Sequence, residues 1–316
     1  MVDFRYHLVS IIAVFLALAV GIVVGTAALN GPIVDSLRGN INRLSDDKRD
    51  LEQDVRQMQA EVGAADDFAD TVGPDLLAGA LADERVLLVT TDGVPDGLVE
   101  ELQPVLESAG ASITGRLAVA PALADPESRA LVEDLVAEVV PAGIDLPDGE
   151  PVERAAVELA AALTTGPDAG EVDAAEAQAV VSAFQEADLI TFEGASQTLT
   201  TATLVVVVGG PAPDAGEAAT VEQQQRLEAV LVLAQAFDDR SRGLVVTGPV
   251  GSAGEGGLVA ALRGQSTTAA DVSSVDNADR GLGRVAVVRA LVEQGEGRTG
   301  QYGSGAGATG PLPEAP

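Results

Sequence analysis

The reactive side chains of this chain limit the chemistry that it can perform. Its 316 residues include no cysteine and a single histidine, His7. Without cysteine there is no disulfide, no thiolate metal site and no cysteine nucleophile. His7 stands beside a long apolar segment, so the remainder of the chain has no imidazole for acid–base catalysis. The sequence therefore predicts that the protein is not an enzyme and uses no cofactor.

Two local patterns could still place a ligand. The glycine-rich stretch GPVGSAGEGG, residues 248–257, stands between a predicted strand and a predicted helix, where phosphate can bind. It lacks the Gly-x-Gly-x-x-Gly order and the Lys-Ser/Thr pair of nucleotide loops, which favours a structural turn. Three carboxylates near predicted strand ends, Asp92, Asp188 and Glu193, could hold a hard cation, although solvated turns are the commoner setting for such residues. The identity of any metal stays open.

The chain is strongly acidic, with 49 Asp and Glu residues against 18 Lys and Arg residues and a formal net charge of -31. An acidic surface keeps a protein soluble and repels nucleic acid. No basic patch with interleaved aromatic residues interrupts it. We therefore expect no nucleic-acid partner.

A run without charged residues, residues 8–29, dominates the N-terminal end. A helix of this length measures about 33 Å, which is enough to cross a bilayer core of about 30 Å. A secretory signal usually has a shorter apolar core of about 7–15 residues and a basic start, whereas here Arg5 is opposed by Asp3. The run predicts an uncleaved single-pass anchor, residues 1–29, with a cleaved signal peptide and a buried core helix as alternatives.

Small residues recur at every fourth position of this run: Ala13, Ala17, Gly21 and Gly25. In a helix such a stripe lets a second helix approach closely, and its last two members form a Gly-x-x-x-Gly pair. We therefore predict that copies of the anchor associate within the membrane, as a parallel homodimer or a higher homo-oligomer.

A heptad pattern occupies residues 30–65, beginning at Asn30-Gly31-Pro32, which predicts that the helix breaks or kinks there. β-branched residues at position a with leucine at position d favour a parallel coiled coil, and a lysine at one core position would fix its register. The flanking Asp47 and Glu52 form a like-charge pair, so the coiled coil is weak alone. An amphipathic helix folded back on the rest of the chain is the alternative. The predicted core positions are Leu37, Ile41, Leu44, Lys48, Leu51, Val55 and Met58.

Residues 66–295 alternate between apolar strands and amphipathic helices. The clearest strands are predicted at residues 85–90 and 203–208, and a short edge strand at residues 273–275. Continuous apolar strands separated by helices indicate a mostly parallel sheet covered on both faces, which is a doubly wound α/β domain. Residues 296–316 contain mainly glycine, serine, proline and alanine, which predicts a disordered tail.

Four segments stand in a characteristic order along the chain. They are VSIIAVFLALAVGIVVG at residues 9–25, the heptad helix, ADERVLLVTTDG at residues 82–93 and SSVDNADRGLGRVAVVRAL at residues 273–291. In this order they resemble the MctB-type copper transport outer membrane proteins of actinobacteria, over nearly the whole chain. The resemblance implies a role in copper transport or homeostasis, as a channel or efflux component, with the body outside the cytoplasmic membrane. In the last segment, Asp276, Asn277 and Asp279 suit a turn and a helix cap.

A role for copper is implied only by this resemblance. Soft copper prefers sulfur and imidazole ligands, and the chain offers Met1, Met58 and His7. A membrane-tethered dimeric scaffold or binding module without direct copper chemistry is therefore the alternative function, and a membrane-anchored enzyme is the third. Charge leaves the sidedness open, because basic residues stand on both sides of the anchor.

Overall fold

The computed structural model describes residues 4–167, 170, 172–196, 198–213 and 220–314, with the side chains of residues 27–35 and 96 outside the description. The chain divides into two compact units, Met1–Ala64 and Ala65–Pro316. Each unit has its own architecture.

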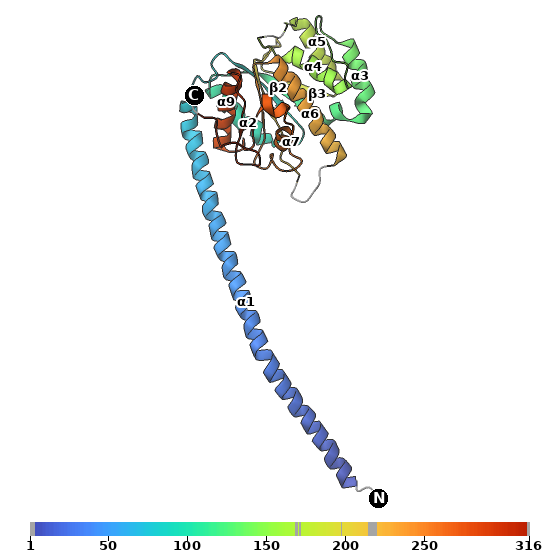
Figure 1. The fold of residues 1–316 in the computed structure, drawn as a ribbon, viewed down its shortest axis with the longest axis vertical. Coiled ribbons are helices and arrows are strands. Elements are labelled where there is room, and N and C mark those ends of the chain that lie inside the picture. Colours follow the sequence, from blue (N-terminus) through green and yellow to red (C-terminus); the bar gives the residue numbers. More distant parts are fainter. Residues whose placement is uncertain (1–3, 168–169, 171, 197, 214–219, 315–316) are drawn as a thin grey trace. The chain divides into compact units, whose positions relative to one another are not determined.

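The first unit is formed by a long helix. α1 extends over Phe4–Leu77, and its last turns belong to the second unit (Figure 1). Of the break or kink predicted at Asn30-Gly31-Pro32, the break is wrong, because the helix continues through these positions. A proline inside a helix costs about 3 kcal/mol, which long helical segments on both sides can offset. The apolar run and the heptad segment therefore belong to one helix.

Within the described residues, the second unit is built on one sheet of seven strands. Their order across the sheet is β3-β2-β1-β4-β5-β6-β7, and every neighbouring pair is parallel except β2 with β3. The expectation of an α/β unit with a mostly parallel sheet is confirmed. The strands are β1 (Arg85–Thr90), β2 (Ser112–Val119), β3 (Ile190–Gly194), β4 (Leu204–Val208), β5 (Leu244–Thr247), β6 (Ser273–Val275) and β7 (Gln301–Tyr302).

A hydrophobic core lies on each face of this sheet, because successive strand residues point to opposite faces. In β1, Val86 and Leu88 join one core, whereas Leu87 and Val89 join the other. The first core is covered by the end of α1, by α2 (Asp96–Ser108) and by α9 (Gly281–Gly295). Figure 1 shows α2 and α9 on one side and α4, α5 and α6 on the other.

The second core is covered by more helices, all from the middle of the chain. The short η2 (Pro126–Ser128) leads into the first of the longer ones. The covering elements are η1 (Pro121–Ala124), α3 (Arg129–Glu138), α4 (Pro151–Leu163), α5 (Ala174–Glu186), α6 (Val221–Arg240), α7 (Leu258–Gly264) and α8 (Thr268–Asp271).

The N-terminus of α9 is capped from α1. Within the second unit, the amide of Gly281 donates to Asp66 Oδ1 at 3.0 Å. A carboxylate is stabilised at this end of a helix by the free amides and by the helix dipole. The prediction that Asp276, Asn277 and Asp279 cap the helix is therefore wrong, because the capping group comes from a distant part of the chain.

Two arginines strengthen this contact between α1 and α9. Arg280 lies 3.3 Å from the Asp66 carboxylate. Arg284 is buried and pairs with Asp70 of α1 and Glu101 of α2, each at 2.7 Å. The last turns of α1 are thus an integral part of the second unit.

The C-terminal segment, predicted as a disordered tail over residues 296–316, is folded in its described part. β7 pairs with β6, so the expected edge strand at residues 273–275 lies inside the sheet. Tyr302 is buried, and its hydroxyl donates to the Glu293 carboxylate. Both predictions were wrong because polar contacts, together with the packing of Tyr302 and Leu312 on the core, fix this segment, and composition does not reveal such contacts.

Candidate functional site

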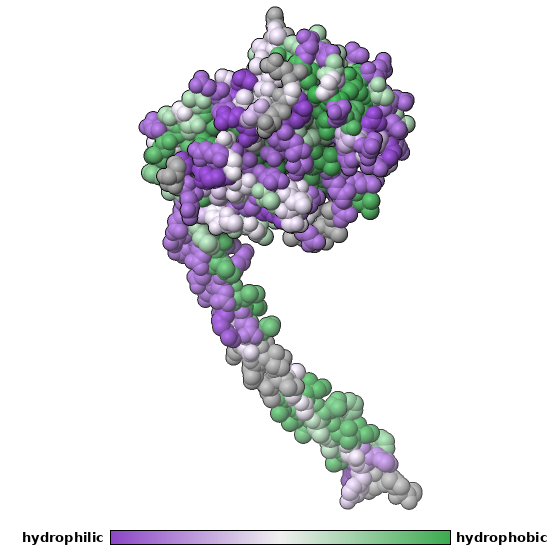
Figure 2. Space-filling view, turned by 45° about the horizontal axis from the view of Figure 1, so that its top comes forward, coloured by the Kyte–Doolittle hydropathy of each residue, from purple (hydrophilic) through white to green (hydrophobic). Residues whose placement is uncertain are grey.

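The N-terminal part of α1 has the length and composition of a membrane span. Phe4–Thr26 is the one helical segment within the described residues that is long and apolar enough to cross a bilayer, and its most apolar 18-residue window has a mean hydropathy of 2.9. No part of its most apolar stretch is buried within the chain. Figure 2 shows hydrophobic residues over the visible face of this part of the helix.

The small residues predicted to pair helices all lie in this span. Ala13 and Ala17 are exposed. A Cβ atom added at Gly21 or Gly25 would meet nothing within 4 Å. This stripe is therefore open to the close approach of a second helix.

The predicted heptad core forms an exposed apolar stripe farther along α1. Its Lys48 forms an ion pair with Glu52 one turn away, at 3.3 Å. This pair offsets part of the repulsion expected between Asp47 and Glu52. An apolar stripe of this length indicates an interaction surface. The exposed members are Leu37, Ile41, Leu44, Leu51, Val55 and Met58.

The side chains that could bind copper through nitrogen or sulfur are few and far apart. His7 and Met58 both lie on α1, roughly 75 Å apart along a helix that rises about 1.5 Å per residue. Met1 lies outside the described residues. Over the described ranges, no group of three or more His, Asp or Glu residues is arranged to hold a metal ion. Within the described residues, one copy of the chain therefore does not bring together a complete set of ligands for a soft metal.

A cavity of about 320 Å³ opens at the carboxyl ends of β1 and β4. The chain leaves β1 toward β2 on one side and leaves β4 toward β5 on the other. Ligands of open α/β sheets bind at such a reversal of strand order. We call this the switch-point cavity. Its walls include Gly93, Val119, Leu123, Pro211, Arg226 and Leu258.

The three predicted cation-binding carboxylates do not form a single cluster. Asp92 lines the switch-point cavity and lies 4.0 Å from Arg226. Asp92 and Glu193 both line an adjoining cavity of about 400 Å³. Asp188 lines neither cavity and occupies a turn with a φ of 56° before β3. The structure therefore brings two of the three to neighbouring walls and leaves the third apart.

The glycine-rich stretch, residues 248–257, has several of its amides bonded within the fold. Ser252 and Gly257 donate to carbonyls within the stretch at 2.9 and 3.0 Å. Val250 donates to Asp279 at 2.7 Å. Amides that are already bonded are not available to a phosphate, so the arrangement supports a structural turn.

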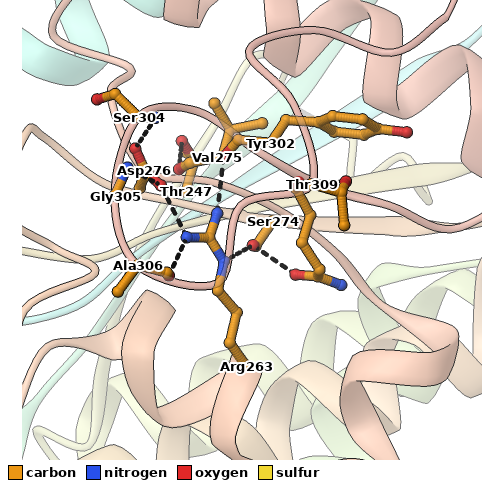
Figure 3. A network of polar contacts seen from close by, with 11 residues as sticks. Thr247, Arg263, Ser274, Val275, Asp276, Tyr302, Ser304, Gly305, Ala306 and Thr309 are labelled. Atoms are coloured by element: carbon orange, nitrogen blue, oxygen red, sulfur yellow. Dashed lines mark hydrogen bonds and ion pairs between the residues drawn. The ribbon is translucent and has the colours of Figure 1, made fainter.

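A buried polar network, which the sequence interpretation missed, holds the C-terminal segment to β6. The Arg263 guanidinium pairs with Asp276 at 2.7 Å, and both side chains are almost wholly buried. Arg263 also donates to the Ser274 hydroxyl and to the carbonyls of Tyr302 and Ala306 (Figure 3). No sequence spacing signals this network, because its members come from α7, from β6 and the residue after it, and from β7 and the segment that follows it.

Asp276 completes the network from the opposite side. Its two carboxylate oxygens accept the amides of Ser304 and Gly305 at 2.8 and 2.9 Å. Each charged group therefore has several partners, which is how a buried ion pair is compensated for lost hydration. The network has a structural role, because it holds the C-terminal segment in place, rather than a reactive one.

This chain matches a known protein family over nearly its full length. Residues 1–313 match the family model described as "Copper transport outer membrane protein, MctB". The chain belongs to the MctB family. It is similar to the copper transporter MctB of Mycobacterium tuberculosis H37Rv, with 30% identity over 98% of both chains. The copper transporter MctB of Mycobacterium leprae is 27% identical over the same shares.

The MctB match extends through every part of the molecule described above. It includes the apolar span, the heptad stripe, the sheet and the segment that carries β7. The family match therefore covers both units, and the resemblance deduced from the sequence is confirmed.

Proposed function

We propose that this protein acts in copper transport as a membrane-anchored homodimer. The observation that carries the proposal is the match of residues 1–313 to the MctB family. Phe4–Thr26 would cross the membrane once, and the second unit would lie outside the cytoplasmic membrane. The second unit would be a doubly wound α/β domain, which is supported by its two helix-covered cores.

Pairing of two parallel chains is supported by two stripes on one helix. The small residues of the span permit close helix contact, and the heptad segment would continue the contact as a coiled coil. Both stripes are exposed in the single chain. A dimeric scaffold that assists copper transport through assembly is therefore the form of the function that we favour.

Catalysis is not part of this proposal. The chain has no cysteine, and its one histidine lies in the apolar part of α1. Copper chemistry within the second unit is also left out, because carboxylates, carbonyls and hydroxyls suit hard cations better than Cu(I). A channel or efflux role would then depend on the assembled membrane part or on a partner.

We expect Gly21→Ile with Gly25→Ile to lower the yield of crosslinked dimer in membranes, because the larger side chains separate the helix backbones. Leu44→Asp with Leu51→Asp should lower it further by charging the coiled-coil core. In a strain that lacks the gene, the wild-type chain should restore copper tolerance and the Leu44/Leu51 variant should not.

Asn42→Asp with Gln53→Asp is the matched control, because it adds the same two charges outside the a and d positions. Its crosslinking should equal that of the wild type. Wild-type crosslinking by all variants would show that neither stripe is the interface. Unchanged copper tolerance of the deletion strain, with altered envelope assembly, would favour the scaffold without a copper role.

We expect the full chain to hold Cu(I) weakly in competition with a chelator, and His7→Ala with Met58→Leu to remove most of that binding. The reason is the ligand supply: residues 59–316 contain no Cys, His or Met. Binding that remains through acidic residues should fall as salt screens their field. A stoichiometric, salt-insensitive Cu(I) complex in the double variant would place a copper site in the second unit and contradict this prediction.

A further inference from the structure

We propose that the switch-point cavity binds a small organic anion with an apolar body, such as an aromatic carboxylate. The site is separate from the copper-transport role and does not depend on it. Three observations carry the inference: the position of the cavity on the sheet, the chemistry of its walls, and the exposure and hydrogen-bonding partners of one arginine.

The position of the cavity follows from the strand order. β1 and β4 are parallel neighbours, and their following segments diverge to opposite sides. The divergence leaves a crevice above the carboxyl ends of both strands, which is where open α/β sheets bind ligands. At its base the two loops approach closely, because a Cβ atom at Gly210 would lie 2.6 Å from the carbonyl oxygen of Gly93. Glycine at position 210 therefore keeps this approach possible.

The walls of the cavity are mostly apolar. Leu123 comes from η1, Leu227 and Val230 from α6, and Leu258 from the start of α7. A volume of about 320 Å³ lies at the small end of the range of about 300–1,000 Å³ for ligand pockets. These features fit a compact hydrophobic body rather than a sugar or a dinucleotide.

Arg226 supplies a cation at this apolar wall. Within the described residues its one polar contact is Asp92 at 4.0 Å, which is longer than a hydrogen bond. Its side chain is 42% exposed, so the guanidinium keeps its donors available. A planar guanidinium binds a carboxylate through two parallel hydrogen bonds. In a chain of net charge -31, an arginine placed this way selects an anion locally.

The test uses two fluorine-labelled probes of the same shape, a naphthoate and the uncharged naphthamide. Binding to the purified full chain in detergent is followed by fluorine NMR. The wild type should prefer the naphthoate. Arg226→Gln should weaken naphthoate binding about tenfold, as loss of one charge-assisted contact predicts, and leave naphthamide binding within about twofold. Arg289→Gln is the matched control, because it removes the same charge from α9 on the opposite face of the sheet.

Ala124→Phe fills the cavity from its half-buried wall and should abolish specific binding of both probes. Signal that persists in this variant measures partition into detergent and is subtracted. If Ala124→Phe fails to fold, as shown by its circular dichroism, Arg226→Gln alone carries the test.

Equal binding by the wild type and a folded Ala124→Phe chain would overturn the site. Absence of naphthoate binding by the wild type would do the same. Equal effects of Arg226→Gln on the two probes would overturn the assignment of an anion. None of these outcomes depends on copper binding or copper tolerance, so they are distinguishable from failure of the proposed transport role.

Discussion

Asp276→Ala is expected to destabilise the second unit by about 3–5 kcal/mol, the range for breaking a buried ion pair by removal of one partner. The substitution leaves the Arg263 guanidinium buried without its counter-ion. It also leaves the amides of Ser304 and Gly305 without their acceptor. Urea unfolding of the full chain, followed by circular dichroism, measures the loss.

The control for this prediction is Glu296→Ala. Glu296 pairs with Arg298 at the surface, where both side chains are about half exposed. Exposed pairs contribute about 0–1 kcal/mol, so the control should unfold almost like the wild type. Hydrogen exchange of residues 301–309 adds a local measurement, since these amides should open first in Asp276→Ala. Equal stability of Asp276→Ala and Glu296→Ala would show that the network does not stabilise the C-terminal segment.

Glu158→Gln is expected to remove most of the decrease in stability between pH 5 and pH 8. Glu158 lies on α4 with no exposed surface, and neither carboxylate oxygen has a hydrogen-bond partner within the described residues. Burial raises the pKa of this carboxyl to about 8, from its usual value of 4.5. Arg154 opposes the shift only in part.

The sign of the effect follows from proton binding. The folded state keeps the proton up to about pH 8, whereas the unfolded state loses it near pH 4.5. The favourable contribution of the neutral group is therefore complete below pH 4.5 and is lost as the pH rises toward 8. The loss is on the order of 3–4 kcal/mol, because each unit of pKa difference corresponds to about 1.4 kcal/mol.

Urea unfolding of the wild type, Glu158→Gln and Glu186→Gln at pH 5 and pH 8 checks this prediction. The substitution by glutamine changes the free energy of unfolding by the same amount at both pH values. The comparison therefore uses only the difference in free energy of unfolding between pH 5 and pH 8. Glu186 is exposed on α5, and its substitution should leave the difference unchanged. Asp238, whose pKa burial and then Asp239 raise to about 7, should leave a smaller residual slope in every variant. If Glu158→Gln lost as much stability between pH 5 and pH 8 as the wild type, Glu158 would ionise freely in the folded chain.

The sequence predicted those elements whose apolar residues recur with a clear period. The run LVVVV became β4 at the centre of the sheet, and RVLLVT became β1 beside it. β7 escaped prediction because Gln301 and Tyr302 form no apolar run and depend on distant polar partners. Pro32 predicted a break that the helical segments on both sides overrode.

The candidate sites divided in the same way. The stripes on α1 could be located because i, i+4 and heptad spacing are local properties of a helix. The switch-point cavity could not, because its walls come from the ends of β1, β2 and β4, from η1 and α6, and from the start of α7. Two local signals pointed to it, Asp92 as a carboxylate at a strand end and the glycine-rich stretch that contributes Gly256 and Gly257. Arg226 gave none, since one arginine on an amphipathic helix is usually a solvated residue.

β7 has a consequence for how this protein is made. The network around Arg263 and Asp276 lacks several of its partners until residues 301–306 have emerged from the ribosome. Among the strands of the sheet, β7 comes last in the chain, so the other six strands are synthesised before it. A prematurely terminated chain would present β6 as a bare edge beside a buried charge, a combination that invites aggregation.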